Sequence, residues 1–112
     1  MSEEKKYSSI HYASYLGLDK ILTAQHPRSK QLGQEAHEET LFIIIVHQVY
    51  ELWFKQILHE VGSVMNLFKT KNVDEKNIDM AVSRLERVNE IIKLLVQQIR
   101  VIETMTPLDI RT

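Results

Sequence analysis

The pattern that most restricts the fold is a pair of seven-residue repeats near the C-terminal end of the chain. One series is Ile78, Leu85, Ile92 and Ile99, and the other is Ala81, Val88, Leu95 and Ile102. Apolar residues at this spacing lie along a helix and form a seam like that of a coiled coil. We therefore predict a helix over residues 74–105, with Asp74 or Asn72 as its N-cap and Pro107 ending it.

A second long helix is predicted over residues 36–68. The apolar run at residues 41–46 could form a buried strand, because β-branched residues favour strands. Apolar residues continue at helical spacing as far as Phe68, however, and a segment of that length favours a helix. Before Leu58 they cover most of the helix circumference, which indicates burial on several sides.

The N-terminal part of the chain predicts less structure. Residues 1–10 are polar and are expected to fray. A short helix is predicted over residues 12–25, although Gly17 weakens it. Residues 26–34 have the composition of a loop. The simplest role of Tyr12 and Tyr15, three residues apart, is to pack this helix onto the others.

These elements predict an all-α fold with a short N-terminal helix and a long antiparallel helical hairpin, forming one domain over residues 11–112. One hairpin and a short helix cannot cover the apolar circumference of the 36–68 helix. We therefore expect the chain to pack against another copy or a further segment, as part of a helical-bundle oligomer.

Composition excludes several classes of function. The 112 residues carry 14 Lys and Arg against 15 Asp and Glu, so no excess of positive charge points to nucleic acid. The absence of cysteine excludes disulfides and thiolate metal sites, and fits a cytoplasmic protein. The N-terminus has no apolar core of a signal peptide, and the longest apolar run is too short to span a bilayer. We expect no nucleic acid and no membrane as partner.

His47 interrupts the bulky stretch FIIIVHQVYELWFKQ and is the first candidate for chemistry. Helical spacing puts Tyr50, Glu51 and Phe54 on its side of the helix. One interpretation is a core histidine satisfied by Glu51 or a backbone carbonyl. The other is a histidine that lines a cofactor or substrate pocket as a base or ligand. A di-metal centre is disfavoured, because the 74–105 helix has no histidine to complete one.

Three stretches of the chain resemble the tryptophan 2,3-dioxygenase family. They are YASYLGLDKILTAQ at residues 12–25, HQVYELWFKQILHE at residues 47–60 and RLERVNEIIKLLVQQIRVIETMTPLD at residues 84–109. They occur in the family's order and at about its spacing. The resemblance implies an all-α, haem b-dependent homotetramer. Its reaction inserts both atoms of O2 across the indole C2–C3 bond of L-tryptophan to give N-formylkynurenine, in the kynurenine pathway of tryptophan catabolism.

The resemblance also implies roles for individual residues. His47 matches the distal histidine, which faces the indole N–H on the O2 side of the haem. Residues that reach into the neighbouring subunit's active site are matched by Tyr12, Tyr15 and Leu16. The family's pocket phenylalanine lies four residues before the histidine, whereas Phe42 lies five before His47. Ile43 takes that position, unless a one-residue helical bulge returns Phe42 to the pocket.

The matched stretches do not include the rest of the iron site. The family's arginine that clamps the substrate carboxylate lies in a motif that Arg111 does not match. No residue matches the proximal haem ligand, so we assign no metal ligand. We therefore expect this chain to carry the distal half of an active site and to be catalytically inactive by itself. The alternatives are an inactive truncated relative that acts as a helical oligomerisation module, or a bundle in which His47 itself binds haem iron.

Overall fold

The computed structural model describes residues 11–27, 40–69 and 71–105. The chain divides into two compact units, residues 1–36 and residues 37–112, and each is described by itself. Every regular element in the described residues is a helix, which confirms the predicted all-α class. The single domain over residues 11–112 stays a prediction. The expected fraying of residues 1–10 lies outside the described residues.

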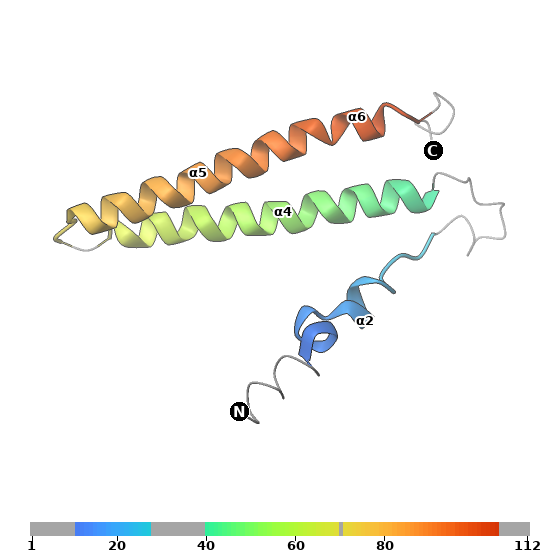
Figure 1. Ribbon diagram of the computed structural model, residues 1–112, viewed down its shortest axis with the longest axis horizontal. Helices are drawn as coiled ribbons and strands as arrows, with labels where there is room; N and C mark the ends of the chain where they lie inside the picture. The colour runs from blue at the N-terminus through green and yellow to red at the C-terminus, as the bar shows by residue number, and fades with distance from the viewer. Residues whose placement is uncertain (1–10, 28–39, 70, 106–112) are drawn as a thin grey trace. The chain divides into compact units, whose positions relative to one another are not determined.

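In the first unit the helix predicted over residues 12–25 is broken at Gly17. Residues 11–16 are helical, and α2 covers only Leu18–Ile21 (Figure 1). Gly17 between them has φ +64°, in the left-handed region that glycine adopts without a steric penalty. The prediction of one continuous helix was therefore wrong, because a left-handed residue cannot continue a right-handed helix.

The second unit contains the predicted antiparallel hairpin. In it α4 covers Thr40–Leu67, α5 covers Glu75–Gln97 and the short α6 covers Ile99–Ile102. Figure 1 shows α4 and α5 running side by side in opposite directions, with α6 continuing from α5. The prediction that the first of these helices begins at Ala36 falls on residues outside those described.

The ends of α5 show where the sequence pattern was accurate and where it was not. The predicted N-cap is confirmed, because the Asp74 carboxylate accepts a hydrogen bond from the Asn77 N–H at 2.9 Å. The predicted helix does not run unbroken to residue 105. It is interrupted at Gln98, whose N–H is shared between the carbonyls of Leu94 and Val96.

Only one of the two heptad series packs against α4. Ala81, Val88 and Leu95 are buried, together with Ile91 and, on α4, Val64. The other series stays 43–48% exposed at Ile78, Leu85, Ile92 and Ile99. The prediction of one seam made by both series was therefore wrong. The two series lie about 60° apart around the helix, and α4 covers only the side that carries Ala81, Val88 and Leu95.

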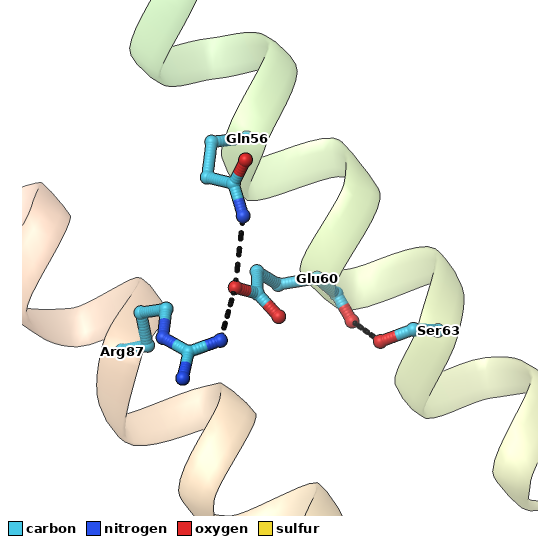
Figure 2. A network of polar contacts seen from close by, with 4 residues as sticks. All are labelled: Gln56, Glu60, Ser63 and Arg87. Carbon is cyan, nitrogen blue, oxygen red and sulfur yellow. Dashed lines mark hydrogen bonds and ion pairs between the residues drawn. The ribbon is translucent and has the colours of Figure 1, made fainter. Parts of the chain in front are cut away.

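A buried carboxylate connects the two long helices. Glu60 of α4 is only 3% exposed and accepts hydrogen bonds from Arg87 of α5 at 2.7 Å and from Gln56 at 2.9 Å. Figure 2 shows these contacts, with the Ser63 hydroxyl donating to the Glu60 backbone carbonyl. The two donors compensate for removing the charge from water. The hydrogen bonds from Arg87 and then Gln56 lower the pKa of the Glu60 carboxyl.

A second connection lies toward the other end of the hairpin. The Tyr50 hydroxyl donates to the backbone carbonyl of Leu95 at 2.7 Å. This carbonyl is one of the last four of α5, where a helix has too few donors of its own. Tyr50 therefore supplies a donor to the end of α5 from the neighbouring helix.

By length and composition alone α4 could also cross a membrane. Exposed Glu51 and Lys55 lie near the middle of α4. The third charged residue of α4, Glu60, accepts a hydrogen bond from Arg87 of α5. Charged side chains at the centre of a bilayer span are costly. These charges and the contact with α5 favour a bundle helix over a bilayer span.

The buried series should carry the stability of the hairpin. Leu95→Ala should lower the free energy of unfolding by about 2–5 kcal/mol, because it leaves a cavity beside α4. Leu58→Ala, at a position 71% exposed, is the matched control and should change it by about 0.5 kcal/mol or less. Urea unfolding followed by circular dichroism measures both. Equal losses in the two variants would contradict the assignment of the seam.

The Glu60 contact should make the hairpin sensitive to acid. Because folding lowers the pKa of Glu60, its contribution is complete above the ordinary pKa of a glutamate. That contribution is lost as pH falls through the lowered pKa of the folded state. Glu60→Gln should therefore flatten the dependence of unfolding on pH in this acidic window. The measurement is the midpoint of thermal unfolding at a series of pH values from neutral downward. Glu51→Gln, at an exposed glutamate, is the control.

Candidate functional site

One side of α4 is turned away from α5 and contains His47. Most residues along it are apolar, and we call this row the His47 face: Ile43, His47, Phe54, Leu58 and Met65. Exposed Glu51, one turn after His47, borders the row. The residues of the His47 face follow one another at intervals of four and seven residues, which places them in one row along a helix. All but half-buried Ile43 are exposed. An apolar surface of this kind is typical of a site that another element or a ligand covers.

The imidazole of His47 is fixed by its own helix. Its Nδ1 lies 2.9 Å from the backbone carbonyl oxygen of Ile43, one turn earlier. A carbonyl oxygen can only accept, so in the neutral ring Nδ1 carries the hydrogen and Nε2 is left as an acceptor. Of the two partners considered for His47, the backbone carbonyl is therefore the one observed. The contact orients the ring and still leaves one nitrogen for a ligand.

Phe42 and Ile43 lie on different sides of α4. The helix is regular from Thr40 to Leu67, without the bulge that would bring Phe42 round to His47. Ile43 therefore lies one turn from His47, as its carbonyl contact shows. Phe42 instead lines a shallow apolar groove of about 200 Å³ between the start of α4 and the α5–α6 junction. The structure brings Ile43 to His47, and Phe42 to the inside of the hairpin.

The other residues expected beside His47 are only partly brought together with it. Phe54 shares the His47 face, and Glu51 is exposed on the same helix. Tyr50 turns its hydroxyl toward α5, while its ring lies 6.0 Å from that of Phe54 in a tilted arrangement. This structural role of Tyr50 could not be predicted from the sequence, because the spacing of side chains does not show which backbone carbonyl of a neighbouring helix lies within reach.

Three further candidates lie in the first unit. Tyr12 and Tyr15 are 71% and 86% exposed, and Leu16 is 41% exposed. All three belong to the helical residues 11–16, immediately before the break at Gly17. The helical spacing puts them on one side of that turn. Two aromatic rings and a leucine are thus presented to whatever lies beside this segment.

No group of three or more His, Cys, Asp or Glu side chains that could hold a metal ion occurs in residues 11–27, 40–69 and 71–105. Within these ranges, the chemistry at the His47 face is that of a single oriented imidazole on an apolar surface. Such a face can exclude water, accept one hydrogen bond and pack against a flat ring.

Comparison with known proteins gives a consistent match. The family model described as tryptophan 2,3-dioxygenase matches residues 2–112. Tryptophan 2,3-dioxygenase from Bdellovibrio bacteriovorus is 55% identical over 104 residues, which are 93% of this chain and 29% of that protein. Tryptophan 2,3-dioxygenase B from Danio rerio is 55% identical over 101 residues, 89% of this chain and 25% of that protein.

A third relative extends the match to another group of organisms. Tryptophan 2,3-dioxygenase from Dictyostelium discoideum is 50% identical over 100 residues, which are 89% of this chain and 25% of that protein. The chain thus spans between a quarter and a third of the length of these curated relatives.

Proposed function

Because the chain belongs to the tryptophan 2,3-dioxygenase family, we propose that it supplies the distal half of the active site of a haem-dependent dioxygenase. The reaction is the oxidation of L-tryptophan by O2 to N-formylkynurenine, in the cytoplasm. The observation that carries the proposal is the contact between His47 Nδ1 and the Ile43 carbonyl on an open apolar face. With Nδ1 engaged in this contact, Nε2 is the ring nitrogen that is left for a flat substrate.

The His47 face fits the wall of a haem pocket in its chemistry. Phe54, Leu58 and Met65 are exposed apolar side chains that suit a porphyrin or an indole ring and exclude water. When bound, haem supplies the iron that holds and activates O2. The proximal ligand belongs to a part of the family pattern that this chain does not match, so no residue here is assigned to the iron.

The role of His47 is to orient the substrate. Its Nε2 accepts a hydrogen bond from the indole N–H of tryptophan, while the Ile43 carbonyl prevents the ring from turning away. Ile43 packs beside the indole, in the position that Phe42 would take in a bulged helix. In a homo-oligomer, a tetramer in the family, the pocket of a neighbouring subunit is completed by Tyr12, Tyr15 and Leu16.

A second function is favoured by the large apolar surface that α4 does not cover on α5. In that alternative the chain is an inactive relative that acts as a helical oligomerisation module. The two functions differ in what a complete enzyme does with this segment. If the chain is part of a dioxygenase, the segment must support turnover of tryptophan in a complete enzyme. If it is an oligomerisation module, it needs only to support assembly.

A chimaera tests the proposal directly. The segment of the Bdellovibrio relative that this chain matches is replaced by this chain, and N-formylkynurenine formation is measured with haem, a reductant and L-tryptophan. The chimaera should be active, and His47→Ala should lower kcat/KM about tenfold or more, as expected for losing a hydrogen bond that orients the substrate. The matched control is His59→Ala, at an exposed histidine on another side of α4, and it should leave turnover unchanged. Equal activity with and without His47 would contradict its role.

The haem spectrum of the same chimaera separates the remaining interpretations. If His47 is distal, His47→Ala should retain haem and its Soret band while turnover falls. Loss of the band together with activity would instead make His47 an iron ligand. An assembled, haem-containing chimaera that never turns over tryptophan favours the oligomerisation module. The isolated chain should be inactive, because the iron lacks a proximal ligand.

A further inference from the structure

The end of the hairpin that carries His47 is packed more loosely than the other end. Within α4, all of whose residues the structure describes, only Glu60 and Val64 are buried, and both lie in its second half. Near the start of α4, the shallow apolar groove of about 200 Å³ lies between α4 and the α5–α6 junction. Apolar burial therefore does little to hold α4 against α5 near His47, and a directed hydrogen bond matters more there.

Tyr50 supplies such a bond one turn after the histidine. Its hydroxyl donates to the Leu95 carbonyl at 2.7 Å, and its ring lies 6.0 Å from that of Phe54 on the His47 face. Tyr50 follows His47 by about 5 Å along the helix axis, whereas Glu60 follows it by about 20 Å. Of the two polar connections to α5, the Tyr50 contact is thus the one that acts on the turn carrying His47.

The carbonyl that accepts the Tyr50 hydroxyl lies where α5 is interrupted. In a continuous helix the Leu95 carbonyl would accept from the Ile99 N–H, four residues later. Here α5 ends at Gln97 and α6 begins at Ile99, while Gln98 between them keeps right-handed angles of φ −64° and ψ −18°. This ψ is that of a tightened turn of the 3₁₀ type.

The sequence of the junction offers no other cause for the interruption. Kinks in helices occur at proline, at glycine and serine, at π-helical turns, or where a side chain inserts into the ladder of backbone hydrogen bonds. Residues 90–102, all of them described, contain no proline, glycine, serine or π-helical turn. The Tyr50 hydroxyl, which reaches the ladder from α4, is a side-chain donor at the point of interruption.

We propose that Tyr50 is a positioning residue for His47. Its hydroxyl replaces the Ile99 N–H at the Leu95 carbonyl, and this contact anchors the turn of α4 that carries the imidazole to the end of α5. The role of His47 rests on the proposed function, whereas the anchor requires neither haem nor tryptophan. Tyr50 acts through His47, because it sets where the Nε2 acceptor lies relative to the rest of the hairpin.

Amide hydrogen exchange of the 112-residue chain, followed by NMR, tests the anchor. Tyr50→Phe keeps the ring and removes the hydroxyl. The amides of residues 44–51 should then exchange about three- to tenfold faster, the factor expected for losing one hydrogen bond. The Ile99 amide should exchange more slowly, because the Leu95 carbonyl becomes available to it.

A general loss of stability would give a different pattern of exchange. Ile91→Val, at a buried position of the same interface, is the matched control and should speed exchange without protecting the Ile99 amide. Two results would overturn the proposal. One is unchanged exchange of residues 44–51 in Tyr50→Phe, and the other is an Ile99 amide that exchanges no more slowly than in the wild type.

The chimaera with the Bdellovibrio relative tests what the anchor does for His47. Tyr50→Phe should lower kcat/KM for tryptophan about three- to tenfold. It should cause no further loss in a His47→Ala background, because the hydroxyl acts through the imidazole. Ile91→Val should leave kcat/KM unchanged in both backgrounds.

The outcomes for the two proposals are distinguishable. Full kcat/KM in Tyr50→Phe, or equal losses with and without His47, would overturn the positioning role. Full turnover in the His47→Ala chimaera would instead overturn the proposed function, and the exchange pattern would then decide the anchor by itself.

Discussion

The buried carboxylate of Glu60 is the contact on which the arrangement of the hairpin depends. A charge that is 3% exposed must have its donors in place, and one of them, Arg87, comes from the other helix. Sliding α4 along α5 by one turn would separate the carboxylate from the guanidinium and leave a charge without its partner. Apolar packing at Val88 and Leu95 supplies stabilisation, but it tolerates small shifts more easily than this polar contact does.

The packing of α4 against α5 also determines which side of each helix remains exposed. The side of α4 that holds Glu60 and Val64 is buried, so His47 and Leu58 are directed outward. On α5, burial of the Ala81 series leaves the Ile78 series exposed about 60° away. A single hairpin contact therefore produces two apolar surfaces with different chemistry. One contains an imidazole whose Nδ1 contacts the Ile43 carbonyl, and the other consists of aliphatic side chains of α5.

The elements that could be predicted were those set by local rules. Helical periodicity predicted the hairpin, and Asp74 was identified as an N-cap because capping needs only a nearby N–H. The division between the two heptad series could not be predicted, because it depends on how far one partner helix reaches. At the site, the sequence selected His47 but left Phe42 and Ile43 as alternatives. Phe42 and Ile43 lie on different sides of α4 because the helix has no bulge, and the absence of a bulge could not be predicted from the residue types.

The break at Gly17 has a consequence for how the first unit can change. Tyr12, Tyr15 and Leu16 all precede it, and α2 follows it, so two backbone angles at one residue set the direction of three side chains. A residue with a β-carbon favours negative φ at this position, and that change would reorient Tyr12 and Tyr15 relative to α2. Gly17→Ala would therefore change the direction of residues 11–16 relative to α2, whereas the contacts between α4 and α5 do not involve this residue.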